Sequence, residues 1–280
     1  MKLGLLAGSG EIPKTIAEHT VASGDSIFIV AIRGFEEDWM KAYPHQICGI
    51  AEFGAQIKAF RSAQCDTISF IGNVKRPDFS NLKPDLKGMS ILPKVIRAAS
   101  KGDDALLRTV IECFEKEGFA VIGAQELLKN LNSPAGLLTR RPPNEADLKD
   151  IQRAFDVAGE IGRLDIGQGA VVARGLVLAV EAQEGTDEML KRVARLPDAI
   201  RGTEDVRCGV LLKRPKPIQE ARIDLPTAGC ETVRRAAEAG LSTLALVEDG
   251  ALLVNQTEMI DLANAYDMTI VVLRPDGGMP

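Results

Sequence analysis

Apolar and polar residues alternate in blocks along the first half of the chain, and the blocks predict strands and helices in turn. Short apolar runs that end at glycine predict buried strands, whereas apolar residues three and four positions apart predict helices. Strands are expected in KLGLLAG (2–8), SIFIVAIRG (26–34), DTISFIGNV (66–74) and FAVIGAQEL (119–127). Helices are expected in 11–24, in 53–65 and, as one or two helices, in 89–118. This alternation predicts an α/β domain with a parallel sheet and helices on both faces.

The pattern changes between residues 131 and 147, where LNSPAGLLTRRPPNEAD carries three prolines and no apolar periodicity. Such a stretch is typical of a connection between domains. We therefore expect a first domain over 1–132, a linker over 133–143 and a second domain over 144–280.

The second domain is expected to combine hairpins with helices. Hairpins are predicted in 168–180, with the turn at Arg174-Gly175, and in 242–255, and further strands in 207–215 and 268–275. Helices are predicted from Asn144 to 163, in 186–196 and in 229–240. Hairpins with interspersed helices predict a mixed-sheet α/β domain.

Composition limits the function. At about 100–200 residues per domain, 280 residues predict two domains. A net charge of −5 argues against a nucleic-acid partner, because phosphate contacts need a basic surplus. No signal-peptide pattern and no membrane-spanning run are found, so a cytoplasmic protein is expected. With two histidines and five widely spaced cysteines, any metal must be held by carboxylates, which favours Mg²⁺ or Mn²⁺.

The first candidate site follows the first predicted strand, at GSGEIP (8–13). A glycine turn that enters a helix lets backbone amides approach a phosphate, so Ser9 and Gly10 are candidate ligand contacts. A tight structural turn is the alternative. Pro13 and Glu11 depart from the dinucleotide fingerprint, and Arg33 replaces the ribose-binding acid, which leaves NADP as a weak cofactor candidate.

A second candidate loop, IGNVKRPDF (71–79), follows the third predicted strand. The carboxyl ends of parallel strands share one sheet edge, so this loop should lie beside the first. Gly72 permits close approach, Asn73 can donate and accept, and Lys75 and Arg76 bring positive charge.

The first hairpin of the second domain leads into several acidic residues. Thr186 is expected to cap the next helix, with Asp187 and Glu188 complementing its dipole. Glu181 and Glu184 are harder to explain by capping and are candidates for holding a cation or a polar ligand.

The stretch KPIQEARIDLPTAG (216–229) precedes a predicted helix. Thr227 is expected to cap that helix, and Lys213, Lys216 and Arg222 would draw a phosphate to its start. Asp224 would then be a metal ligand or a base for water. From spacing alone, an Asp224 bound to Arg222 or to helix amides is an equal alternative.

Six motifs, in this order, resemble one family: LAGSGEIP, GNVKRPDF, KGDDALLR, DIGQGAVV, LAVEAQEGTDEML and PKPIQEARIDLPTAG. The family is the UDP-2,3-diacylglucosamine pyrophosphatases of the LpxI type, from the lipid A pathway of Gram-negative bacteria. The resemblance runs from about residue 1 to residue 275. It implies a Rossmann-like N-terminal domain, a C-terminal domain of different fold, and a lipid product bound between them. Ala228 is a departure, since many relatives carry isoleucine there.

The resemblance also implies an activity: hydrolysis of UDP-2,3-diacylglucosamine to 2,3-diacylglucosamine 1-phosphate (lipid X) and UMP, with Mg²⁺ and with water attacking the α-phosphorus. Asp224 matches the aspartate of the R-x-D-x-P-T motif and is the expected catalytic residue. Asp224, Glu181 and Glu184 are the expected metal ligands. The expected substrate contacts are Ser9, Gly10, Gly72, Asn73, Gln168, Lys213, Arg222 and Thr227.

The resemblance further implies a homodimer, and the lipid substrate suggests peripheral contact with the inner face of the inner membrane. Two other functions stay open: an NADP-dependent oxidoreductase, and a non-catalytic regulator that binds nucleotide or lipid. The segment LPKVIRAASKG (92–102) is expected to be an ordinary core helix, with an apolar flap over acyl chains as the alternative.

Overall fold

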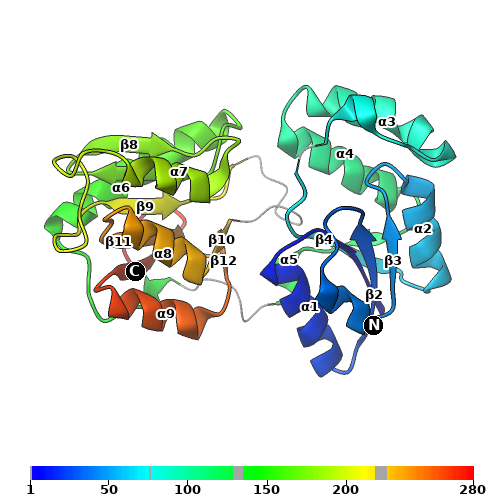
Figure 1. Cartoon of the computed structure of the whole chain (residues 1–280), viewed down its shortest axis with the longest axis horizontal. Helices are drawn as coiled ribbons and strands as arrows, with labels where there is room; N and C mark the ends of the chain where they lie inside the picture. The colour runs from blue at the N-terminus through cyan, green and yellow to red at the C-terminus, as the bar shows by residue number, and fades with distance from the viewer. Residues whose placement is uncertain (1, 76, 129–134, 218–225) are drawn as a thin grey trace. The chain divides into compact units, whose positions relative to one another are not determined.

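The computed structural model describes residues 2–75, 77–128, 135–217 and 226–280. The described residues divide into two compact units, 2–128 (unit 1) and 135–217 with 226–280 (unit 2) (Figure 1). No helix in the described ranges has both the length and the apolar character needed to cross a bilayer.

Unit 1 is built on a five-stranded sheet in which every strand pair is parallel, as the sequence predicts. The strand order is β3-β2-β1-β4-β5. β3 was not expected, because three of its four residues are exposed and show no apolar alternation, as suits an edge strand. The strands are β1 (Lys2–Ala7), β2 (Ser26–Ile32), β3 (His45–Cys48), β4 (Thr67–Ile71) and β5 (Ala120–Val121).

Helices cover this sheet, and the apolar run over 89–118 forms two of them, because the chain breaks at Gly102 with φ +130°. Phe60, Phe70, Phe114 and Phe119 form an aromatic core with edge-on and tilted contacts. The helices are α1 (Glu11–Ala22), α2 (Phe53–Ser62), α3 (Leu86–Ala99), α4 (Asp103–Glu115) and α5 (Ala124–Leu127), with 3₁₀ turns at Asp38–Ala42 and Phe79–Asn81.

Unit 2 contains a six-stranded mixed sheet in the order β6-β13-β11-β9-β7-β8, which confirms the predicted mixed α/β architecture. The three strands β13, β11 and β9 run parallel, while β6, β7 and β8 pair antiparallel with their neighbours. The strands are β6 (Gly136–Leu137), β7 (Gly169–Ala173), β8 (Leu176–Val180), β9 (Val210–Lys213), β11 (Thr243–Val247) and β13 (Thr269–Leu273). A separate parallel pair is formed by β10 (Thr227–Ala228) and β12 (Leu252–Leu253).

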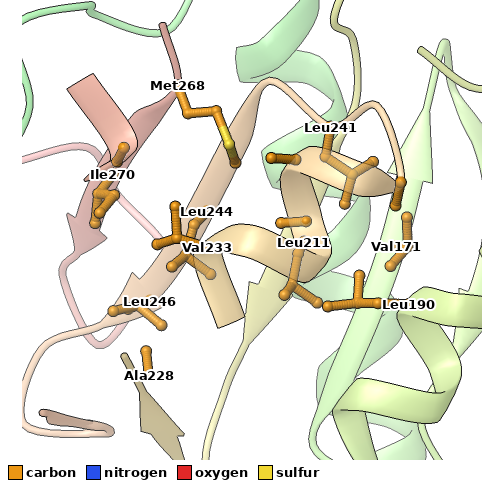
Figure 2. Close-up of a cluster of buried hydrophobic side chains, with 14 of the residues drawn as sticks. Val171, Leu190, Leu211, Ala228, Val233, Leu241, Leu244, Leu246, Met268 and Ile270 are labelled. Atoms are coloured by element: carbon orange, nitrogen blue, oxygen red, sulfur yellow. The ribbon is translucent and has the colours of Figure 1, made fainter. Parts of the chain in front are cut away.

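Alternate residues of this sheet face two different cores. Helix α6 (Glu145–Arg163) packs through Ala154 and Phe155 on the face that carries Leu212 and Val271. The opposite face packs against α7 (Gly185–Ala194) and α8 (Cys230–Glu238), and α9 (Gln256–Ala265) adds Met259 and Ala263 to the same core. Figure 2 shows this second core, with Leu211 and Leu244 of the sheet facing Leu190 of α7 and Val233 of α8.

The first predicted hairpin is confirmed, and a buried carboxylate holds its turn. Arg174 and Gly175 have φ values of 52° and 77°, the left-handed conformations that a two-residue hairpin turn requires. Asp150 of α6 accepts hydrogen bonds from the Arg174 amide at 2.8 Å and the Gly175 amide at 2.7 Å. This clamp ties the hairpin to the helix beneath it.

The second predicted hairpin, over 242–255, is wrong. Strand β11 is hydrogen-bonded on both edges, to β9 and to β13, so no edge is left for β12. The chain therefore turns at Asp249 and β12 pairs with β10 in another sheet.

Part of the expected linker over 133–143 belongs to unit 2. Residues 136–137 form β6 at the sheet edge, and Arg141 binds the hydroxyl of Thr269 at 2.8 Å and the carboxylate of Asp147 at 3.1 Å. Backbone pairing at an edge needs no apolar periodicity, so the sequence pattern carried no sign of it.

Two predicted helix caps are also wrong. α7 begins at Gly185, one residue before Thr186, and has no side-chain cap. α8 has Gly229 at its N-cap, and Thr227 lies two residues earlier in β10. Both threonine side chains are thereby left for other contacts.

Candidate functional site

The first group of candidate residues lies where the strand order of unit 1 changes direction. β1 is flanked by β2 on one side and β4 on the other, and such a switch point is where open α/β sheets usually bind ligands. The loops that follow β1 and β4 are joined by an isolated antiparallel bridge. The Ser9 amide donates to the Asn73 carbonyl at 3.1 Å, and the Asn73 amide donates to the Ser9 carbonyl at 2.8 Å. The structure thus brings Ser9, Gly10, Gly72 and Asn73 together.

Two glycines make this bridge sterically feasible. A Cβ at Gly8 would lie 2.5 Å from the carbonyl oxygen of Asn73, so no side chain fits there. Gly72 has φ +105°, and a Cβ would meet the Gly8 carbonyl carbon at 2.8 Å. The glycines after β1 and β4 therefore serve the close approach of two loops.

The backbone amides of the first loop already have protein acceptors. Gly8 donates to the Ile71 carbonyl at 2.9 Å, and Gly10 donates to Glu37 Oε1 at 3.2 Å. The other oxygen of Glu37 accepts the indole N–H of Trp39 at 2.6 Å. A pyrophosphate would compete with the Glu37 carboxylate for Gly10 at the start of α1, which disfavours the dinucleotide interpretation.

Arg33, the candidate partner for an NADP phosphate, is also engaged. Its guanidinium binds both carboxylate oxygens of Glu52, at 3.0 and 3.3 Å. This hydrogen bonding lowers the pKa of Glu52 and raises that of Arg33. The NADP hypothesis relies on the Gly10 amide and the Arg33 guanidinium, and both are bound to carboxylates of the protein.

The second group of candidate residues lies at one end of the unit 2 sheet, where Glu181, Gly169 and Lys213 face each other across three strands. Gly169 pairs with Lys213, and the Glu181 amide donates to the Gly169 carbonyl at 2.8 Å. Lys213 is two residues beyond Leu211 and Glu181 two beyond Ala179, so both side chains lie on the α7–α8 face.

Gly169 leaves room for the Glu181 carboxylate, because a Cβ at this glycine would lie 2.7 Å from Glu181 Oε2. Glu181 is 6% exposed, and its Oε1 accepts the Thr186 hydroxyl at 2.9 Å. Within the described ranges, Oε2 is buried and has no hydrogen-bond partner. A buried carboxylate oxygen in this state favours a cation or a proton donor from a ligand.

Lys213 is 4% exposed, and its ammonium donates to the Thr227 carbonyl at 2.6 Å. This bond ties the end of β9 to β10, two residues before the N-cap of α8. Gln168 precedes Gly169, and its carbonyl accepts the Arg214 amide at 2.9 Å. The structure therefore gathers Gln168, Glu181, Lys213 and Thr227 at the same sheet end.

The remaining candidates form ion pairs with other side chains or lie outside the described residues. Glu184 binds Arg192 at 2.7 Å, so its charge is balanced within α7. Lys216 binds Asp165 at 2.8 Å, and both side chains are largely buried. Asp224, Arg222 and Arg76 lie outside the described residues.

In the part of the chain that the structure describes, no three His, Cys, Asp or Glu side chains are grouped to hold a metal ion. The orphaned Glu181 Oε2 nevertheless fits a hard cation as one ligand. The full metal-ligand set stays a prediction.

Sequence reasoning missed two residues that shape these groups. Glu37 holds the Gly10 amide from 27 positions away, and no local pattern indicates such a contact. Gly169 was visible as part of a glycine-rich passage, but its role depends on the pairing of β7 with both neighbours.

These features define a two-domain α/β protein with a Rossmann-like first unit and a polar, buried strand end in the second. The family model of the LpxI N-terminal domain matches residues 2–131, and that of the LpxI C-terminal domain matches residues 134–271. A UDP-2,3-diacylglucosamine pyrophosphatase LpxI from Caulobacter vibrioides is 53% identical over 275 residues, which cover 98% of each chain. The chain belongs to the LpxI family, as its motifs predict.

Proposed function

We propose that this chain hydrolyses UDP-2,3-diacylglucosamine to 2,3-diacylglucosamine 1-phosphate and UMP, a step of lipid A biosynthesis. The observation that carries the proposal is the 53% identity to the Caulobacter vibrioides pyrophosphatase over 98% of both chains. The occupied Gly10 amide and the Arg33–Glu52 pair argue against the NADP-dependent alternative.

Pyrophosphate hydrolysis needs a positioned water and neutralisation of the phosphoryl oxygens, with little covalent chemistry. Asp224 is the proposed catalytic carboxylate, on the strength of the R-x-D-x-P-T motif. A bound Mg²⁺ or Mn²⁺ would supply positive charge to the phosphoryl oxygens, with Asp224 and Glu181 as the proposed ligands. Glu184 is the weaker candidate, because its carboxylate is balanced by Arg192.

Lys213 is proposed to present positive charge to the substrate from a fixed position. Its burial and its 2.6 Å bond to the Thr227 carbonyl support that role, since a held side chain loses little freedom on binding. Gln168 and Thr227 of unit 2 are proposed substrate contacts, and so is Arg222 of the R-x-D-x-P-T motif.

In unit 1, the proposed substrate contacts are Ser9, Gly10, Gly72 and Asn73, with Gly10 proposed as a point of close approach and not as a phosphate donor, because its amide donates to Glu37. The bridge between the two loops supports this assignment, because it fixes the backbone from which the exposed Asn73 side chain projects. A side-chain amide can both donate to and accept from a sugar or uracil group.

A cytoplasmic homodimer in peripheral contact with the inner membrane completes the proposal. The lipid nature of the substrate supports membrane contact. Light scattering of the purified chain tests the dimer, and fractionation of cells tests the location.

The central test is incubation of the purified chain with UDP-2,3-diacylglucosamine and Mg²⁺, followed by quantification of UMP. The expected result is UMP release that stops on chelation and resumes when Mg²⁺ is restored. Substrate binding without UMP release would overturn the proposal and identify a non-catalytic binding protein.

Asp224→Ala is expected to lower turnover by about 10²-fold or more and still to bind intact substrate. Asp261→Ala is the matched control, because Asp261 is an exposed aspartate of α9 that lies outside the R-x-D-x-P-T motif. Near-normal turnover of Asp224→Ala at saturating Mg²⁺ would refute the catalytic assignment. Loss of binding as well would assign Asp224 to anchoring.

A further inference from the structure

Helix α3 exposes a continuous apolar stripe, defined here as Leu86, Met89, Pro93 and Ile96. The spacing of three, four and three residues places all four on one side of the helix. Leu86 is 84% exposed, Met89 53% and Ile96 42%, and Pro93 is exposed as well. Three of the six large hydrophobic side chains that the described part of unit 1 exposes therefore lie on this one helix.

The sequence-based expectation of an ordinary core helix holds for only one side of α3. Gly88, Val95 and Ala99 are its buried residues, and the helix packs mainly against α4 and α2. In Figure 1, α4 lies between α3 and the sheet. The stripe is therefore apolar surface beyond what packing in unit 1 requires.

The charged residues of α3 itself are all basic. Helix α3 contains no acidic residue. Lys87 pairs with Glu117, and Lys94 pairs with Glu112 at 2.6 Å. Arg97, Lys101 and Lys83 are exposed and have no acidic partner within 4.0 Å among the residues that the structure describes. We call these three residues the basic flank.

We propose that α3 docks this protein on the surface of an anionic lipid bilayer. The stripe enters the boundary between head groups and acyl chains, and the basic flank binds anionic head groups, as in other amphipathic surface helices. A second copy of the chain is a poorer occupant, because a two-fold contact through α3 would bring two basic flanks together. The inference rests on the membrane contact proposed above and names the helix that makes it; it does not require the proposed hydrolysis.

The test is co-sedimentation of the full chain with vesicles of phosphatidylcholine alone or mixed with phosphatidylglycerol, without substrate. Binding is expected only to the anionic vesicles, and it should weaken as salt screens the head groups. Replacing Arg97 and Lys101 with glutamine is expected to weaken binding roughly fivefold for each charge removed.

The triple variant Leu86→Ser, Met89→Ser, Ile96→Ser is expected to weaken vesicle binding by about tenfold or more. Val21→Ser and Ile47→Ser are the matched controls, because these side chains are 51% and 44% exposed and lie on α1 and β3. Both controls should bind vesicles as the parent chain does. Thermal unfolding verifies that the triple variant is folded.

Three results would overturn the inference: no binding of the parent chain to anionic vesicles at low salt, parent-like binding of the triple variant, or a smaller oligomer of the triple variant in light scattering. The last would identify the stripe as a subunit interface. UMP release from detergent-dispersed substrate is measured in parallel and should be unchanged in the triple variant. If the parent chain releases no UMP, that result counts against the proposed hydrolysis and not against membrane docking.

Discussion

Replacing Gly8 with alanine is expected to separate the two loops that carry the polar residues of unit 1. The added Cβ would lie 2.5 Å from the Asn73 carbonyl oxygen and 2.8 Å from Val74 Cγ2. The shortest ordinary separation between a carbon and a carbonyl oxygen is about 3.3 Å, so the loop after β4 must move by roughly 0.8 Å. Gly8 itself has an unexceptional φ, so the effect is one of space and not of backbone strain.

The magnitude follows from the bonds that this movement breaks. The Asn73 carbonyl oxygen that the methyl would strike is also the acceptor for the Ser9 amide at 3.1 Å, and the reciprocal bond is 2.8 Å long. Each such bond is worth about 1 kcal/mol net, and overpacking adds about 1–3 kcal/mol. With two such bonds, the bridged state should therefore lose about 3–5 kcal/mol.

Hydrogen exchange at the Ser9 and Asn73 amides measures this loss directly, which is preferable to one unfolding free energy for a chain of two units. Protection of both amides is expected to fall by about 100-fold or more, and UMP release by about tenfold in kcat/KM. Gly229→Ala is the control, because its Cβ would meet only Val254, at 3.5 Å. Parent-like protection in Gly8→Ala would refute the steric reasoning.

Three further changes probe the rest of the molecule. Glu181→Gln is expected to lower kcat/KM for UMP release by about tenfold or more. Thr186→Val removes the hydroxyl that binds Glu181 but keeps the carboxylate charge, so its loss of kcat/KM should be smaller. Equal losses in the two variants would show that the carboxylate only anchors α7. Asp150→Asn should destabilise unit 2 by about 1–3 kcal/mol in denaturant titration, because one of two hairpin amides loses its acceptor; an unchanged midpoint would contradict the clamp. The hydrogen bond from Lys87 lowers the pKa of Glu117 in the folded state. The pair therefore stabilises unit 1 fully above the pKa of glutamate in the unfolded chain, and this stabilisation is lost as the pH falls through the lower pKa of the folded state. Glu117→Gln should lower the free energy of unfolding by less than about 1 kcal/mol and flatten the acidic part of its pH profile. An unaltered pH profile would count against this contribution of the ion pair.

The sequence predicted most elements of unit 1, because their signals are local, but the strand expected over 119–127 is only Ala120–Val121 and is followed by α5. The buried strands Lys2–Ala7, Ser26–Ile32 and Thr67–Ile71 are short apolar runs between breakers, and each agrees with its prediction. The Arg174-Gly175 turn was also predicted, because a glycine between two apolar runs permits the positive φ that such a turn requires. The candidate residues Ser9 and Asn73 followed from the same logic, because parallel strands end at one edge.

The errors concern pairings that local patterns do not encode. The run 242–255 has the appearance of a hairpin, yet β11 takes parallel partners on both sides and leaves β12 to another sheet. The expected threonine caps failed for a similar reason. Thr186 binds Glu181 instead of the start of α7, a contact that depends on where β8 ends.

By itself, the sequence determined two α/β domains, the family to which the chain belongs, and the residue types available for chemistry. The tertiary structure decided which of those residues meet. Glu181 and Lys213 are 32 positions apart, and they share one face of the sheet because β7 pairs with β8 on one edge and with β9 on the other. Gly169, the residue between them, carries no side chain, and that space admits the buried carboxylate. Hydrogen-bond register between distant strands sets this arrangement, and no local pattern of apolar and polar residues specifies it.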